Sequence, residues 1–368
     1  MDWLATSQLV DRRSFMKSTG AAFATGLLPR QAFALSASDA VLASAYRDRN
    51  GTFGVAVLSE QGEILWQQAL PSRGHDVVFG PTGETLVVFA RRPGTFAVAI
   101  DLGHKQNSST ILSPSDRHFY GHGCFSADGK LLYATENDFE NAKGKLGIYD
   151  ASDNYRRIGE FETFGIGPHD MGLMSDGRII LVANGGIETH PDFLRTKLNL
   201  STMRPNLSFI DTKDGSLLAQ FELPKTHHKL SIRHLAKAGE ASAWFACQNQ
   251  DELSDLKPLV GRVSLVSGKL ELLELPDAVL AGLRGYVGSI ACDNESAQIA
   301  ITSPRVGIAH IIDPSTNTIK ETISQKDICG VAAQNNRFML SSGGGFFDGH
   351  QMPLHWDNHL TSNITSSA

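Results

Sequence analysis

Histidine residues recur in this sequence at a fixed spacing. His75, His122 and His169 are separated by 47 residues each (75 to 122, 122 to 169), and His234 opens a similar but more divergent segment. Neutral imidazole is a good ligand for iron, copper, zinc and nickel. Four imidazoles brought together by a repeating fold could therefore hold a transition metal, for which we expect iron or copper. No local metal-binding motif of the H-E-x-x-H type accompanies them.

Polar side chains recur at a second position of the same segments. They comprise arginine, carboxylate and amide groups: Arg91, Glu136, Asn137, Asn184, Asn249 and Arg305. Arginine favours carboxylates and oxyanions, because its planar guanidinium can bind two oxygens at once. A metal with an anionic co-ligand would use both sets of residues. Structural hydrogen bonding between neighbouring repeats, or inheritance from one duplicated unit, also explains the histidines, so both interpretations stay open.

The segments that carry these residues share one pattern of predicted strands. A short apolar strand leads to a tight turn with glycine, a second apolar strand follows, and a third ends in Asp101, Asp150 or Asp211. Alternating strands between glycine and aspartate turns are typical of antiparallel hairpins. Four-stranded units of about 40 to 50 residues are typical of propeller blades. We therefore predict an all-β, seven-bladed β-propeller, with six blades as the alternative, closed by strands from both chain ends.

This fold predicts where the polar residues meet. In a propeller the first strand of each blade lines the central channel, and the start of that strand lies on the same face as the end of the second strand. The histidines and the second polar set should therefore converge on one channel mouth. Because side chains alternate across a strand, we expect Asp76 and Asp170, which follow two of the histidines, to point to the opposite side.

Two further segments bear on this predicted site. Residues 187–207 lengthen a loop at the channel mouth and add His190 to the predicted ligand-binding residues. A long loop in a repeat protein is typical of a lid, and equally of a partner-binding surface. The histidine-rich tail from Gly349 to His359 fits no ligand motif, and we expect it to form a flexible end.

The first 34 residues have the pattern of a twin-arginine export signal. Arg12-Arg13 are followed by Phe15 and Lys17, then by a weakly apolar stretch and the small-residue site Ala32-Phe33-Ala34. We expect cleavage there, which leaves residues 35–368 as one propeller domain in the periplasm. Because this route exports folded proteins, a metal could be loaded before export.

Composition excludes several other classes of protein. The formal net charge is −6, with no basic cluster of the kind that nucleic-acid binding requires. No run reaches the roughly 18 apolar residues of a membrane span. The four cysteines lie in apolar runs without metal-type spacing, which favours buried free thiols. We expect a monomer.

The central third of the chain resembles a known bacterial family. The runs GHGCFSADGKLLYATEND and GIGPHDMGLMSDGRIILVANGGIETHPDF, with LSIRHL, LRGYVGSIA and CGVAA, are similar to a family of twin-arginine-exported propellers of unknown function. That family is related to the YVTN and quinoprotein amine dehydrogenase-like propellers. Its genes often stand beside those of imelysin-type iron-regulated proteins and di-haem oxidoreductases. The resemblance implies a periplasmic role in iron acquisition and supplies no catalytic residues.

These observations favour a binding protein over an enzyme. Our first hypothesis is a periplasmic propeller that holds a metal ion or metal complex at its histidine-lined mouth. A second is an interaction scaffold for periplasmic iron-uptake proteins, with the 187–207 loop as the contact. A third is a metal-assisted hydrolase or redox enzyme that uses the same mouth. No nucleophile, phosphate-binding or haem-attachment motif supports a specific reaction.

Overall fold

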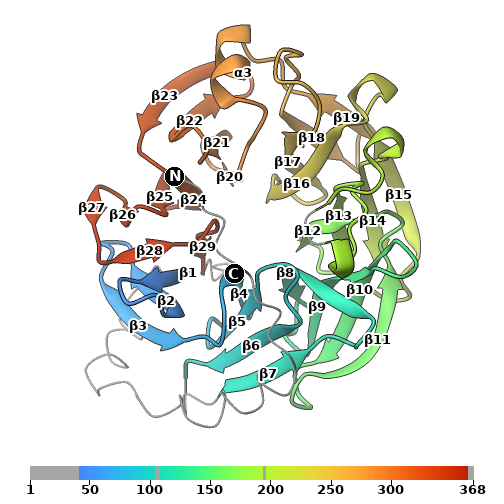
Figure 1. Cartoon of the computed structure of the whole chain (residues 1–368), viewed down its shortest axis with the longest axis vertical. Helices are drawn as coiled ribbons and strands as arrows, with labels where there is room; N and C mark the ends of the chain where they lie inside the picture. The colour runs from blue at the N-terminus through green and yellow to red at the C-terminus, as the bar shows by residue number, and fades with distance from the viewer. Residues whose placement is uncertain (1–40, 104–107, 194–195, 364–368) are drawn as a thin grey trace.

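The computed structural model describes residues 41–103, 108–193 and 196–363. These residues form seven antiparallel sheets arranged around a central axis, which confirms the predicted all-β, seven-bladed propeller (Figure 1). The predicted export signal at residues 1–34 lies outside the described residues. The sheets follow one another around the ring in chain order, and we number the blades 1 to 7 accordingly.

Blades 2 to 7 are four-stranded meanders whose first strand lies nearest the axis (Figure 1). Blade 2 contains β4 (Gly74–Phe79), β5 (Thr85–Ala90), β6 (Phe96–Asp101) and β7 (Ser108–Leu112). Blade 3 contains β8 (Arg117–Phe125), β9 (Leu131–Asp138), β10 (Lys143–Asp150) and β11 (Arg156–Glu162). Blade 4 contains β12 (Pro168–Leu173), β13 (Ile179–Asn184), β14 (Asn206–Asp211) and β15 (Leu217–Glu222).

The later blades repeat this arrangement. Blade 5 contains β16 (Leu230–Lys237), β17 (Ser242–Asn249), β18 (Val260–Ser264) and β19 (Lys269–Leu272). Blade 6 contains β20 (Ser289–Asp293), β21 (Gln298–Ser303), β22 (Ile308–Asp313) and β23 (Thr318–Ser324). Blade 7 contains β24 (Ile328–Gln334), β25 (Arg337–Ser342), β26 (Phe346–Phe347) and β27 (His350–Gln351). The helix α3 (Asp277–Leu283) precedes blade 6 and buries Leu280 and Leu283.

Blade 1 joins the two ends of the chain. It contains β1 (Val41–Asp48), β2 (Phe53–Ser59) and β3 (Ile64–Ala69), with β28 (Leu354–Trp356) and β29 (Thr361–Ser362) on the inner side of β1. The predicted closure by both ends is confirmed, and the expected flexible tail at 349–359 is wrong. The inner edge of β1 would otherwise leave its backbone groups unpaired, and the tail pairs with it.

Apolar side chains fill the space between neighbouring sheets. Val55 and Val57 of β2 pack in one cluster with Leu86 and Val88 of β5, and all four are almost fully buried. Burying both faces of every sheet in this way is what makes a ring of blades stable. The inner strands are left with one edge toward the axis, where polar side chains can gather.

The inner strands are irregular at the level where the histidines lie. The pairing register shifts in β4, β8, β12, β16 and β24 against their neighbouring strands. Such a bulge inserts an extra residue and turns side chains away from strict alternation. The bulges therefore change which side chains face the channel.

Two features outside the channel agree with the sequence. The four cysteines are free, and three of them, Cys124, Cys247 and Cys329, are buried. None of the helices in the described part of the chain has the length and apolar character needed to cross a lipid bilayer.

Candidate metal centre and arginine-lined cavity

Five imidazoles, one from each of blades 1 to 5, meet on the propeller axis. His359 lies between β28 and β29, and the others lie on the inner strands of their blades: His75, His122, His169 and His234. The centroids of neighbouring rings are 4.6–6.2 Å apart. The four histidines predicted from their spacing thus come together as expected. His359 is a fifth member that the sequence analysis assigned to a flexible tail.

Local features of the chain make room for these rings. Gly121 has φ of 105°, and a Cβ there would lie 2.6 Å from Cδ2 of His75, so a larger residue would displace that imidazole. On the opposite side, Ser44 of β1 donates a hydrogen bond to the carbonyl of His359 at 2.6 Å. Glycine in β8 and serine in β1 therefore fix two of the rings.

Several nitrogens in this cluster lack a protein partner. Among the described residues, no hydrogen bond reaches His75 Nδ1, His122 Nε2, His234 Nδ1 or His359 Nε2, although all four atoms are buried. Such groups are rare in folded proteins and call for an explanation. Two triplets, His75–His122–His359 and His122–His169–His234, each bring their ligand atoms within 4.8 Å of one another. A bound metal ion would supply the missing partner.

His122 is bracketed by two carboxylates. Its Nδ1 lies 3.1 Å from Oδ2 of Asp76 and 3.4 Å from Oδ1 of Asp170. The expectation that these aspartates point away from the channel is wrong, because the bulges in β4 and β12 break the alternation of side chains. A carboxylate on Nδ1 fixes the tautomer and directs Nε2 toward the centre, as in the carboxylate–histidine–metal arrangement.

The protonation of the five rings differs in consequence. Burial lowers the pKa of His75 to about 4, and it lowers the pKa of His169, His234 and His359 well below the usual value. Burial opposes charge on His122 also, but attraction by Asp170 and Asp76 outweighs it and raises the pKa of that ring. These four imidazoles are therefore neutral at pH 7.

Arg233 separates one histidine from the rest. Its guanidinium Nη1 lies 3.2 Å from Nδ1 of His169 and donates a hydrogen bond to it. A neutral His169 then carries its proton on Nε2, so neither nitrogen is free to bind a metal. Because Arg233 engages His169 in this way, the triplet of His75, His122 and His359 is the better candidate site.

A basic cavity of about 350 Å³ opens above the rings. Four arginines line it together with aromatic, amide and imidazole groups: Arg91, Arg92, Arg233, Arg305, Tyr120, Tyr286, Gln248, Asn358 and His118. Burial, reinforced by repulsion from Arg92, lowers the pKa of Arg233 to about 10. No carboxylate belongs to this lining in the part of the chain that the structure describes.

A second, acidic cavity of about 180 Å³ also borders the rings. Asp76 and Asp170 line it with His122 and His359. Burial, with repulsion from Asp76, raises the pKa of Asp170 to about 6, whereas nearby imidazoles outweigh burial and lower the pKa of Asp76. The imidazole cluster thus borders both a basic and an acidic cavity.

The second set of predicted site residues divides between the cavity and the blades. Arg91, His190 and Arg305 line the basic cavity. Glu136 does not, because it is fully buried in blade 3, where Arg157 and Tyr149 donate hydrogen bonds to it. Such a paired carboxylate has no oxygen facing the channel.

The predicted amides lie close to the mouth but stabilise loops. Asn184 donates hydrogen bonds to the carbonyl of Thr163 and to Oδ1 of Asn206. Asn249 Oδ1 accepts a hydrogen bond from the backbone of Asp251. Asn137 donates to His118 Nε2 and to the carbonyl of Thr189, both at 3.0 Å, and so fastens the 187–207 loop to blade 3. None of the three lines the cavity.

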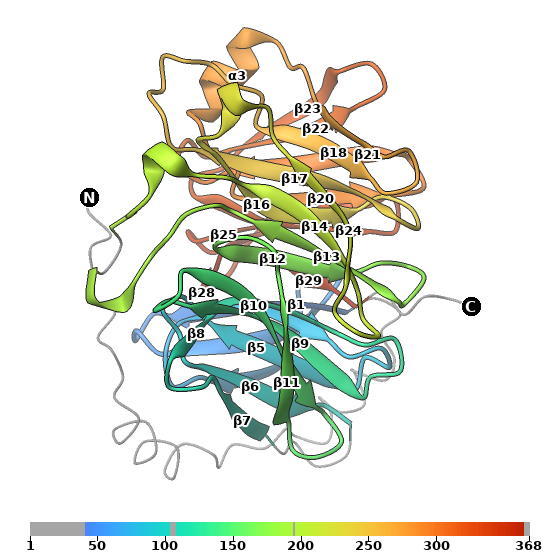
Figure 2. The ribbon, with the colours of Figure 1, turned by 90° about the vertical axis from the view of Figure 1, so that its right-hand side faces the viewer.

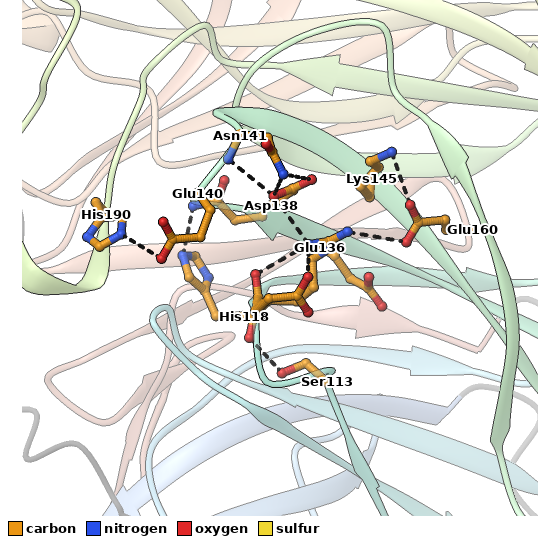
Figure 3. Close-up of polar contacts among 12 residues, drawn as sticks. Ser113, His118, Glu136, Asp138, Glu140, Asn141, Lys145, Glu160 and His190 are labelled. Carbon is orange, nitrogen blue, oxygen red and sulfur yellow. Dashed lines mark hydrogen bonds and ion pairs between the residues drawn. The ribbon is translucent and has the colours of Figure 1, made fainter.

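The 187–207 loop projects from one face of the disc (Figure 2). It contains the short helices η1 (Pro191–Phe193) and η2 (Leu200–Thr202), and its residues Thr189, His190 and Pro191 form part of the cavity wall. His190 Nε2 lies 3.5 Å from Oε1 of Glu140, which connects the loop to the turn after β9 (Figure 3). The predicted position of this loop at the channel mouth agrees with the structure.

Several important residues were not recognised from sequence. His359 and Asp357 belong to the tail, and the only signal for them was that a seventh inner strand had to follow residue 350. Asp357 lies between Arg73 and Arg91, whose charges outweigh burial and lower its pKa, and it is 3.6 Å from Nδ1 of His75. Arg233 directly precedes His234, and no motif marks it.

Comparisons with known proteins give a fold and a family. Hydrazine synthase of Kuenenia stuttgartiensis is structurally similar, with a TM-score of 0.60 and 12% identity over 88% of this chain and 95% of that chain. This similarity is in the fold alone. No curated protein matches the chain. The family described as "Protein of unknown function (DUF1513)" matches residues 68–363, and the chain therefore belongs to that family.

Proposed function

We propose that this protein binds a transition metal ion, iron or copper, at His75, His122 and His359. The observation that carries the proposal is that His122 Nε2 and His359 Nε2 are buried without a hydrogen bond to the described residues, and that the three rings place a ligand atom within 4.8 Å of one another. An all-imidazole donor set suits copper, zinc, nickel and iron. Three protein ligands leave coordination positions open for a further ligand.

The electrostatics of the cluster support the same proposal. His75 and His359 are neutral at pH 7, because burial lowers their pKa, so their lone pairs are available to a cation. Asp76 and Asp170 contribute negative charge next to His122 without entering the triplet. A metal bound there would be held by neutral ligands and balanced by nearby carboxylates.

We place this binding in the periplasm and connect it with iron acquisition. The twin-arginine pattern at residues 12–17 supports export of the folded protein, so the metal could be incorporated before export. The gene neighbourhood of the resembling family supports the connection with iron. The function proposed is storage or transfer of the metal rather than a chemical reaction.

Metal analysis of the exported protein tests the proposal. We expect one iron or copper ion per chain, and a loss of affinity of about 100-fold or more in His122→Ala and His359→Ala, because each removes a ligand. His169→Ala should keep the metal, since Arg233 already donates a hydrogen bond to Nδ1 of that ring. His310→Ala is the matched control, because His310 is a buried histidine of β22 that bonds Thr322 away from the channel.

The outcome can contradict the proposal in two ways. Protein that neither contains a metal nor shows a thermal shift with iron, copper or zinc would leave the histidines with a structural role. Equal loss of metal from His310→Ala and His359→Ala would show that the affinity is not specific to the channel.

A second candidate function is a scaffold for periplasmic iron-uptake proteins. The 187–207 loop supports it, because Phe193 and Leu198 are 55% and 40% exposed although both are large apolar side chains. Replacing both by serine should abolish co-purification with such a partner and leave the metal content unchanged. Retained co-purification would exclude this surface.

A further inference from the structure

The basic cavity carries more positive charge than the carboxylates of the described residues balance. Of its four arginines, Arg91 is paired with Asp357. Arg92, Arg233 and Arg305 form no ion pair with any carboxylate among the described residues. Like charges gathered in one pocket destabilise a protein unless they serve a ligand. The lining of the cavity would therefore accommodate an anion.

Aromatic rings hold two of these guanidinium groups in place. Arg92 lies over the ring of Tyr120 with Cζ 5.5 Å from the centroid, and Arg305 lies over Tyr286 at 4.6 Å. A guanidinium stacked in this way keeps its N–H edges free to bind oxygens in a bidentate manner. Both arginine side chains are already ordered by this stacking before a ligand binds, which reduces the entropic cost of binding.

Arg233 gives an independent sign of a missing ligand. Its Nε is buried and has no hydrogen-bond partner in the part of the chain that the structure describes, while its Nη1 contacts His169. Arg92, Arg233 and Arg305 line the same cavity. Burial, followed by repulsion from these three arginines, also lowers the pKa of Lys197.

We infer that this cavity binds a small polyanion with two or more carboxylate or phosphate groups, held by Arg92, Arg233 and Arg305. The volume of about 350 Å³ admits a ligand of metabolite size. Tyr120, Gln248 and Asn358 add hydrogen-bonding groups for hydroxyl or carbonyl oxygens. His75 and His234 also line the cavity, so the anion lies next to the histidine cluster, but its binding requires no metal.

Calorimetric titration of metal-free protein, prepared with a chelator, tests this inference. The probes are citrate for carboxylates, pyrophosphate for phosphates and acetate as a single-charge reference. We expect citrate or pyrophosphate to bind and acetate to bind at least about tenfold more weakly, because it can engage one arginine only. The polyanion that binds more tightly shows whether the cavity prefers carboxylate or phosphate groups.

Two variants assign the binding to the cavity. Arg92→Gln and Arg305→Gln should each weaken the polyanion by about tenfold or more and reduce the salt dependence of binding. Arg262→Gln is the matched control, since Arg262 stacks on Trp244 at 5.8 Å but does not line the cavity. Thermal unfolding of each variant confirms that it is folded.

The inference is overturned if no polyanion binds to the wild-type protein, or if Arg262→Gln weakens binding as much as the cavity variants do. The metal proposal is tested separately by His359→Ala. That variant should lose metal and keep the polyanion, whereas Arg305→Gln should lose the polyanion and keep the metal.

Discussion

His122 differs from the other four channel imidazoles in the groups that contact its ring. Two carboxylates contact its Nδ1, whereas the other rings contact a guanidinium, a more distant carboxylate or one another. Its pKa is raised while theirs are lowered. The two aspartates therefore make His122 more basic than the other rings of the cluster.

Asp170→Asn tests this role at the level of one residue. The change keeps the shape of the side chain but removes the charge that orients and polarises His122. We expect metal affinity to fall by about 10- to 100-fold, as is typical when such a partner of a ligand is altered. Metal titration of the purified variant measures the effect.

Asp128→Asn serves as the control for this experiment, because Asp128 lies in an exposed turn of blade 3. Unchanged affinity in Asp170→Asn would mean that the carboxylate does not act through His122.

The residues of the site were predictable only in part. His75, His122 and His169 could be identified because duplicated blades preserve their spacing, and His234 because its segment still resembles the others. His359 could not, since blade 1 is split between the two ends of the chain and its inner strand has no repeat context. The contacts of Glu136 with Arg157 depend on packing inside one blade, which spacing does not encode.

At the level of elements, the ring depends on the short strands β28 and β29. They supply the inner strand of blade 1 and hold His359 in the channel. Trp356 is 3% exposed and contacts the rings of Tyr46 and Phe347. The large buried side chain of Trp356 thus anchors the closing strand β28.

Trp356→Ala should weaken this closure. Deleting a buried aromatic side chain costs about 3–5 kcal/mol of unfolding free energy. Urea unfolding measures the change, and Val266→Ala, at a side chain that is 84% exposed, should leave stability unaltered. A loss below about 1 kcal/mol in Trp356→Ala would show that the closing blade contributes little.

The strands and the blade count follow from sequence period, but the bulges do not. Alternation predicted that Asp76 would face away from the histidines, and a register shift of one residue between Gly74 and Val77 reversed this. A bulge forms because two neighbouring strands are pulled into different registers, which is a property of the assembled sheet. The site was therefore predictable in its histidines and not in its carboxylates.

At the scale of the whole molecule, the four channel imidazoles with a lowered pKa make stability depend on pH. The pKa of His75 is about 4 in the folded protein and about 6.5 when unfolded. Between these values the unfolded chain binds more protons, so stability rises with pH across this window and is lost as pH falls through it. His169, His234 and His359 act in the same direction.

Metal-free protein should therefore lose unfolding free energy on acidification from pH 6.5 to 4. His75 alone corresponds to about 3 kcal/mol by linkage. Urea unfolding at several pH values measures the slope, and His359→Gln should reduce it. A slope unchanged by that substitution would mean that other groups cause the acid sensitivity.

The cluster of imidazoles borders two cavities of opposite charge. A cation is attracted to one cavity and an anion to the other, so two species of opposite sign can lie next to the same histidines. Thr189, His190 and Pro191 of the 187–207 loop form part of the wall on the arginine side, so an anion held there lies against that loop.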